Sequence, residues 1–190
     1  MKNLYIIGGC NGAGKTTASY TILPEILECK EFVNADEIAK GLSPFQPEKA
    51  SLQAGKLMLT RIQSLLSARE SFAFETTLAT RSYINLIKKA KENCYEITLI
   101  FFWLNSVDLA IQRVKTRVAD GGHNISKEVI KRRYRNGLLN FYKLYKNSVH
   151  SWVFIDNSGD PYQVIAEGIG ENEKVLDQKI WSRIKHEFHE

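Results

Sequence analysis

Residues 4–17 read Leu-Tyr-Ile-Ile-Gly-Gly-Cys-Asn-Gly-Ala-Gly-Lys-Thr-Thr. Within this stretch the pattern Gly-x-x-x-x-Gly-Lys-Thr occupies residues 9–16 and follows a short apolar run from Leu4 to Ile7. The apolar run predicts a buried parallel strand, and a helix is expected to begin near Lys15. A loop of this kind between a strand and a helix binds phosphate groups, so the sequence predicts a nucleotide phosphate site.

The chemistry of this loop assigns a role to each part of it. Glycines let the backbone curl so that successive N–H groups surround an anion, and the helix dipole favours negative charge at the same place. Lys15 can then reach the β- and γ-phosphates, and the hydroxyl of Thr16 can bind Mg²⁺. The alternative is a chance glycine turn. The residues expected to contact the nucleotide are Gly9, Asn11, Gly12, Ala13, Gly14, Lys15, Thr16 and Thr17.

The whole chain has the length and composition of one soluble domain. It has 190 residues, of which 44% are apolar and 25% charged, with a net charge of +5. Its three cysteines are odd in number and lack metal-ligand spacing, which favours a reducing, cytoplasmic location. Cys10 lies in the phosphate loop, where a helix dipole could lower its pKa, or it is simply a small tolerated residue. The most apolar run, Ile97 to Leu104, is too short to span a membrane.

Five short apolar strands are expected to alternate with helices, at residues 4–7, 32–33, 71–74, 97–104 and 152–155. The expected helices cover residues 16–27, 48–69, 80–93, 106–119 and 126–148, and the chain after Pro161 is expected to be helical to its end. This alternation predicts one α/β domain over residues 1–190, with a five-stranded parallel sheet and helices on both faces. Ligands of such sheets bind beyond the carboxyl ends of the strands. The residues expected at that rim, besides the loop, are Asp36, Glu75, Asn105, Asp156 and Asn157.

Two carboxylates on the rim are candidates for chemistry. Asp36 could accept the proton of a substrate hydroxyl or hold Mg²⁺ through water; alternatively it caps a helix that begins at Glu37. Glu75, with Thr76 and Thr77 after it, could hydrogen-bond a substrate; alternatively it is an ordinary polar strand end.

A basic segment follows the fourth strand. From Arg113 to Lys146 there are ten basic and two acidic residues. Arg113 and Arg117 share a helix face, and Arg132 and Arg133 follow a Gly-Gly pair. Arginines that close over a transferring phosphoryl group stabilise its charge, so we expect a helical lid over residues 107–148, with His123 as a weaker candidate.

Two alternatives to the lid remain open at this stage. One is a solvated basic face. The other is a nucleic-acid groove, in which Tyr134, Phe141, Tyr142 and Tyr145 would stack bases. Nucleic acid is the minority interpretation, because Leu138, Leu139, Phe141 and Leu144 also fit a core stripe at helical spacing.

Residues 9–16, 34–36, 74–77 and 113–123 together resemble the motifs of the zeta-toxin-like P-loop kinases, over about residues 3–160. The resemblance implies a nucleoside-monophosphate-kinase-like fold with strand order 2-3-1-4-5, ATP or GTP with Mg²⁺, and phosphoryl transfer to a hydroxyl. Family members phosphorylate UDP-N-acetylglucosamine and are held in check by a small helical antitoxin. By this resemblance Asp36 matches the catalytic base, Glu75 a substrate-binding acid, and Arg113 or Arg117 a lid arginine.

The sequence therefore predicts an ATP-dependent kinase of a small hydroxyl compound, with a UDP-amino sugar as one candidate acceptor. A kinase of another metabolite alcohol is the first alternative. The second is a nucleotide-binding regulator associated with RNA, which would use the basic helices.

Overall fold

The fold is built on a seven-stranded sheet with strand order β2-β3-β1-β4-β5-β6-β7. The computed structural model describes residues 2–119, 122 and 124–188. The strands are β1 (Lys2–Gly9), β2 (Phe32–Val33), β3 (Phe72–Thr76), β4 (Tyr95–Trp103), β5 (Ser151–Asp156), β6 (Gln163–Ile169) and β7 (Asn172–Val175). The first five are parallel, which confirms the expected core order 2-3-1-4-5.

The predicted five-stranded, all-parallel sheet is smaller than the observed sheet. Strands β6 and β7 extend it, and both pair antiparallel. The chain after Pro161 is therefore not helical throughout, and only its last part forms a helix, α7 (Gln178–Phe188). The run Val164-Ile165-Ala166 lies largely inside the core, and Gly168 faces the ring of Trp152 so closely that a side chain would collide with it.

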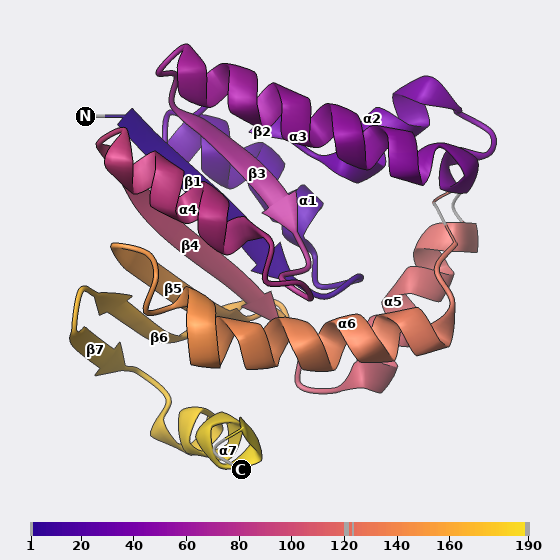
Figure 1. Cartoon of the computed structure of the whole chain (residues 1–190). Coiled ribbons are helices and arrows are strands. Elements are labelled where there is room, and N and C mark those ends of the chain that lie inside the picture. Colours follow the sequence, from indigo (N-terminus) through magenta and orange to yellow (C-terminus); the bar gives the residue numbers. More distant parts are fainter. Residues whose placement is uncertain (1, 120–121, 123, 189–190) are drawn as a thin grey trace.

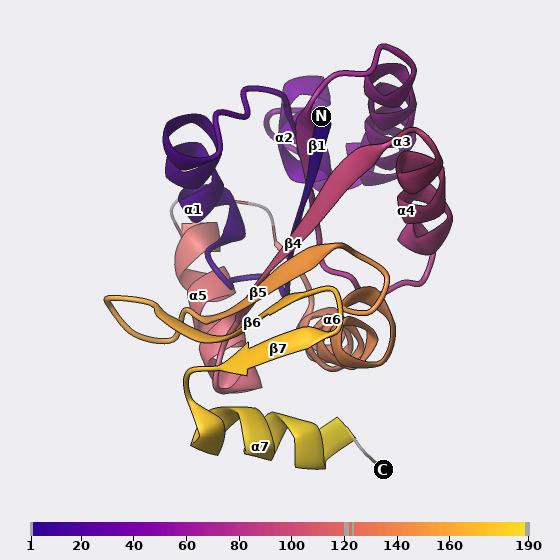
Figure 2. The ribbon, with the colours of Figure 1, turned by 90° about the vertical axis from the view of Figure 1, so that its left-hand side faces the viewer.

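Helices cover both faces of the sheet (Figures 1 and 2). Figure 2 shows α1 and α5 on one side and α3, α4 and α6 on the other. Strand β1 packs against both layers of helices, because its alternate side chains point to opposite faces of the sheet. Leu4 and Ile6 pack in the α3–α4–α6 layer, and Tyr5 and Ile7 pack in the α1–α5 layer. Burial on both faces is the reason that this strand reads as an unbroken apolar run.

The helical elements have the following bounds: α1 (Lys15–Thr21), the π-helical η1 (Ile22–Ile26), α2 (Ala35–Leu42), the 3₁₀ turn η2 (Pro47–Ala50), α3 (Ser51–Ser67), α4 (Tyr83–Glu92), α5 (Val107–Ala119), α6 (Lys127–Asn140) and the π-helical η3 (Phe141–Tyr145). Ser126 caps α6 as expected, its hydroxyl accepting a hydrogen bond from the N–H of Val129. Within the described part of the chain, no helix is both long and apolar enough to cross a membrane.

The segment expected to form a lid is anchored at its C-terminal end. Leu138, Phe141 and Tyr145 are buried in the core, and the side-chain amide of Asn140 donates to the carbonyl of Leu78 at 2.8 Å. This end of the segment therefore belongs to the core and not to a movable lid. The same packing removes two of the four aromatic residues of the nucleic-acid alternative, because Phe141 and Tyr145 face the core and cannot stack bases.

Candidate functional site

The phosphate loop connects β1 to α1 at the carboxyl edge of the sheet. Gly12 and Gly14 have φ of 81° and 83°, a conformation that glycine adopts without strain. The side-chain amide of Asn157, which follows β5, donates to the carbonyl of Ala13 at 2.8 Å and fills the space next to Gly14. A contact from a residue 144 positions later in the chain thus holds the loop in its curled form.

Lys15 and Thr16 meet the carboxylate of Glu75 below the loop. Lys15 Nζ donates to the carbonyl of Cys10 at 2.9 Å and lies 3.4 Å from Glu75 Oε1. Thr16 Oγ1 donates to Glu75 Oε2 at 2.7 Å, and Asn34 Nδ2 donates to the same oxygen at 2.9 Å. Glu75 was expected to bind substrate, but here its carboxylate lies against the residues expected to bind phosphate and Mg²⁺.

Asn34, rather than Asp36, caps helix α2. The side-chain oxygen of Asn34 accepts hydrogen bonds from the N–H groups of Asp36 and Glu37, at 2.8 and 3.4 Å. The alternative in which Asp36 is the cap is therefore wrong. Since the cap is supplied two residues earlier, the carboxylate of Asp36 is available to line the pockets described next.

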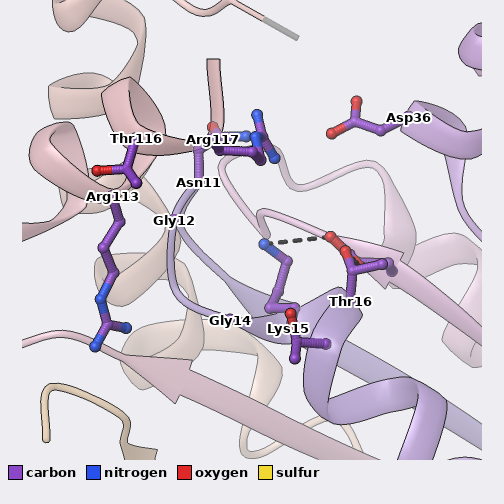
Figure 3. Close-up of a pocket in the computed structure, with 11 residues that line it drawn as sticks. Asn11, Gly12, Gly14, Lys15, Thr16, Asp36, Arg113, Thr116 and Arg117 are labelled. Atoms are coloured by element: carbon purple, nitrogen blue, oxygen red, sulfur yellow. Dashed lines mark hydrogen bonds and ion pairs between the residues drawn. The ribbon is translucent and has the colours of Figure 1, made fainter. Parts of the chain in front are cut away.

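Two adjoining pockets lie over the loop. The first, called here the loop pocket, has a volume of about 410 Å³ and is lined by Asn11, Gly12, Gly14, Lys15, Thr16, Thr17, Asp36, Glu75, Arg113, Thr116 and Arg117 (Figure 3). The second, called the strand-end pocket, has a volume of about 190 Å³ and is lined by Asn11, Lys15, Asn34, Ala35, Asp36, Met58, Glu75, Thr76, Thr77, Tyr83 and Arg133. Both pockets are lined by Asn11, Lys15, Asp36 and Glu75, so they join at these four side chains.

The candidate lid arginines differ in where their guanidinium groups lie. Arg113 donates to the carbonyl of Ser158 at 3.3 Å, and Figure 3 shows its side chain pointing away from Lys15. Arg117 lies near Asn11, on the same side of the loop pocket as Asp36 (Figure 3). Both arginines line that pocket, as their shared helix face predicted.

Arg133 belongs to the strand-end pocket. Its Nη1 donates to Asn11 Oδ1 at 3.1 Å, which ties α6 to the phosphate loop. Burial lowers the pKa of Arg133, and the negative charge of Asp36, which lines the same pocket, opposes this shift. Arg132 is exposed and lines neither pocket. His123 lies outside the described residues.

Two further groups in or beside the site are neutral at ordinary pH. Burial raises the pKa of Cys10 to about 11 despite the nearby Lys15, so the thiol is not activated by the helix dipole. Burial also raises the pKa of Tyr83, and a hydrogen bond with the side chain of Thr76 only partly offsets this. Tyr83 is thus an uncharged phenol on the wall of the strand-end pocket.

Some functional positions were missed by sequence reasoning. Asn34 was quoted within a motif without a role, although Asn followed by Asp two positions later is a recognisable helix cap. Asn157 was expected on the rim but not as a support for the loop. Asn105 is also on the rim, yet its N–H binds the hydroxyl of Ser158, and it lines neither pocket.

Comparison with known proteins gives a consistent result. The family model described as "Zeta toxin" matches residues 1–168. An uncharacterised protein of Haemophilus influenzae is 31% identical over 126 residues, which cover 66% of this chain and 88% of that protein.

Among solved structures, a chain of the AvrRxo1-ORF1:-ORF2 crystal structure with ATP superimposes with a TM-score of 0.75 at 17% identity, covering 97% of this chain. The match spans only 63% of that longer chain. A chain of the PezAT chromosomal toxin–antitoxin system of Streptococcus pneumoniae superimposes with a TM-score of 0.66 at 14% identity, covering 100% of this chain and 88% of that one. At these identities the structural matches establish the fold.

Proposed function

The chain belongs to the zeta toxin family of P-loop kinases, and from this premise we propose that it transfers the γ-phosphoryl group of ATP to a hydroxyl of a small molecule. The observation that carries the proposal is the position of Lys15 and Asp36. Both line the loop pocket and the strand-end pocket, so a phosphate donor in one and an acceptor in the other would meet between them.

In the proposed reaction the loop pocket holds the triphosphate. The loop N–H groups and Lys15 neutralise the phosphate oxygens, and the N-terminus of α1 adds its dipole. ATP is favoured as the nucleotide, since the related AvrRxo1 pair has been crystallised with it. GTP remains the alternative nucleotide.

Asp36 is the proposed general base. The acceptor hydroxyl loses its proton to the Asp36 carboxylate as its oxygen attacks the γ-phosphorus, and ADP leaves with the electron pair of the broken P–O bond. Arg117 of the loop pocket and Arg133 of the strand-end pocket are the residues proposed to stabilise the charge on the transferring group. Arg113 is assigned a smaller part, because its guanidinium binds Ser158.

Mg²⁺ fits the groups present at the loop. The hydroxyl of Thr16 and the carboxylate of Glu75 are hard oxygen donors of the kind that this ion takes, and both residues line the loop pocket. When bound, Mg²⁺ would neutralise part of the negative charge of the phosphate groups. Thr76 and Thr77 are assigned to the acceptor, because they line the strand-end pocket.

The acceptor and the biological partner follow the family as proposals. A UDP-amino sugar is one candidate acceptor, and another metabolite alcohol is the alternative. A small antitoxin is the proposed protein partner, since one structural relative is part of a toxin–antitoxin system. A cytoplasmic location agrees with such a role.

The test is an acceptor screen with ATP labelled in its γ-phosphate. We expect the wild-type protein to transfer label to at least one hydroxyl compound in a set that includes UDP-N-acetylglucosamine, sugars and simple alcohols. Asp36→Asn should retain ATP binding but lose transfer. Transfer at an undiminished rate by Asp36→Asn would remove the base assignment, and binding of ATP with no transfer to any acceptor would favour a regulator instead.

A further inference from the structure

A third cavity, called here the α3–α4 groove, runs between helices α3 and α4 and has a volume of about 570 Å³. This volume lies in the range of small-molecule sites. Its floor is apolar, with Met58, Ile62 and Leu66 buried beneath it. Leu52 and Leu59 line it as well, yet they are 76% and 50% exposed. The groove thus keeps a considerable apolar surface in contact with water.

The α3–α4 groove continues into the strand-end pocket. Ala35, Met58 and Tyr83 line both cavities. Ala35 immediately precedes Asp36 at the start of α2, so the groove opens beside the proposed base. The ring of Tyr83 packs on Phe74 with centroids 5.0 Å apart, which fixes the wall that the two cavities share.

Gly55 lines the groove and leaves part of the α3 surface there without a side chain. It lies in the middle of α3, and a Cβ added there would meet no atom within 4 Å. Glycine weakens a helix interior, and here neither packing nor a special φ requires it. Leu52, Gly55 and Leu59 share one helix face, so a side chain at position 55 would project into the space between the two leucines.

We infer that the α3–α4 groove binds an apolar part of the phosphoryl acceptor, and that the acceptor class is an amphipathic alcohol. Its hydroxyl-bearing head would lie in the strand-end pocket beside Asp36, and its aliphatic or aromatic body would lie along α3. The inference rests on the proposed function, since it requires the reacting hydroxyl at Asp36. It extends that function, because a diphosphate group would gain nothing from this apolar floor.

A small molecule accounts for the groove better than a protein partner does. The cavity leads from the surface to the proposed base, and a helix docked on α3 would not reach Asp36. Besides Tyr83, the polar residues that line the groove are all exposed and could bind polar substituents of the same acceptor: Ser51, Lys56, Gln63, Ser82, Asn85 and Lys89. A few polar groups around an apolar floor are typical of small-molecule sites.

The first test compares methyl glucoside with octyl glucoside, which share a sugar head and differ only in the alkyl chain. Binding is measured by calorimetry and ligand-observed NMR, below the micelle concentration and with a non-hydrolysable ATP analogue present. We expect octyl glucoside to bind the wild-type protein at least about 30-fold more tightly, because each buried methylene adds to the affinity. Gly55→Leu should remove most of this difference.

Two variants serve as matched controls. Gly55→Ala raises the helix propensity at this position, as Gly55→Leu does, but adds little volume. It should therefore keep most of the preference for octyl glucoside. Gly41→Leu adds a side chain to α2 where a Cβ also meets nothing within 4 Å, away from the three cavities, and it should change nothing. Equal affinity for the two glucosides would overturn the inference, as would a Gly55→Leu variant that behaves like Gly55→Ala.

The second test measures transfer of label from γ-labelled ATP to alcohols of increasing chain length. A rising kcat/KM that Gly55→Leu abolishes supports the inference. Transfer to short alcohols or UDP-N-acetylglucosamine with no gain from the chain overturns it and leaves the kinase proposal standing. No transfer to any acceptor overturns the kinase proposal and the acceptor assignment together. Self-association of the wild-type protein that Gly55→Leu abolishes, without chain preference, would assign the groove to a second copy instead.

Discussion

The hydroxyl of Thr16 donates a 2.7 Å hydrogen bond to the carboxylate of Glu75, across 59 positions of the chain. The contact arises because β1 and β3 are neighbours, with Ile7 level with Glu75. The side chains of Lys15 and Glu75 are only 5% and 11% exposed, so the carboxylate balances a buried ammonium group. In a nucleotide complex, phosphate oxygens would supply part of the negative charge that balances Lys15.

Replacing Glu75 should therefore destabilise the nucleotide-free protein. In Glu75→Gln the buried Lys15 loses its counter-charge, and we expect the free energy of unfolding to fall by about 2–3 kcal/mol. ATP added without Mg²⁺ should restore part of that loss, so its stabilising effect should be larger in the variant than in the wild type. Urea unfolding with and without ATP measures both quantities.

Glu31→Gln is the matched control for this change. Glu31 pairs with Arg61 at 2.7 Å, but both side chains are about half exposed, and such pairs contribute less than ~1 kcal/mol. If Glu75→Gln lost no more stability than Glu31→Gln, the carboxylate would not be compensating Lys15.

Arg133 and its neighbour Arg132 offer a direct comparison. Arg133 contacts Asn11 and faces Asp36, whereas Arg132 is exposed. We expect Arg133→Gln to lower kcat by roughly 100-fold, because a charge near the transferring group is removed. Arg132→Gln should stay within about twofold of wild type. Steady-state kinetics with the acceptor found in the screen measures kcat for both variants. An equal fall of kcat in the two variants would contradict the assignment of Arg133.

Asn157 should matter for nucleotide binding rather than for chemistry. Asn157→Ala leaves the carbonyl of Ala13 without its side-chain donor and opens space beside Gly14. We expect the Kd of ATP to rise about tenfold, since a buried unpaired carbonyl costs 1–3 kcal/mol and the loop loosens. The kcat at saturating ATP should change much less.

Asn93→Ala is the control for Asn157→Ala. The amide of Asn93 also donates to a backbone carbonyl, that of Lys89 at 2.8 Å, but it lies at the exposed end of α4. This variant should bind ATP as the wild type does. A Kd for Asn157→Ala that is no different from that of Asn93→Ala would mean that the loop holds its shape without this support.

The core of the fold could be predicted from the sequence because its signals are local. Each buried parallel strand is a short apolar run, and the phosphate loop is one contiguous motif between a strand and a helix. The β6–β7 hairpin was missed, although Val164-Ile165-Ala166 followed by Gly170 is a strand and turn signal. Its burial depends on packing against Trp152 of β5 and Trp181 of α7, which lie outside the hairpin, so the local pattern alone was weak.

The candidate site also has parts that the sequence predicts and parts that only the structure reveals. Lys15, Thr16 and Asp36 were placed correctly at one rim because strand ends of a parallel sheet converge there. The contacts of Arg133 with Asn11 and of Asn157 with Ala13 span 122 and 144 positions, and no spacing rule predicts such pairs. Arg113 and Arg117 share a helix face, yet only the structure reveals that a strand-end carbonyl binds Arg113.

The free energy of unfolding should depend on pH through Glu173 on β7, which lies in the C-terminal part of the fold formed by β6, β7 and α7. Burial tends to raise the pKa of Glu173, but hydrogen bonds from Trp181, Lys146 and Lys185 outweigh it and lower the pKa from 4.5 to about 2. Because the folded-state pKa is the lower one, the contribution is full above about pH 4.5 and is lost as the pH falls toward 2. We expect Glu173→Gln to lose roughly 2 kcal/mol at pH 6.5 and less than half of that at pH 3.

Urea unfolding of wild type and Glu173→Gln at the two pH values measures this narrowing gap. Glu167→Gln is the control, since Glu167 pairs with Lys174 at the exposed edge of the same hairpin and should contribute little at either pH. A gap between wild type and Glu173→Gln that is equal at pH 6.5 and pH 3 would contradict the argument. It would mean that Glu173 titrates alike in the folded and unfolded chain, and that apolar packing, such as that of Trp181 on Trp152 and Phe154, holds α7 to the sheet.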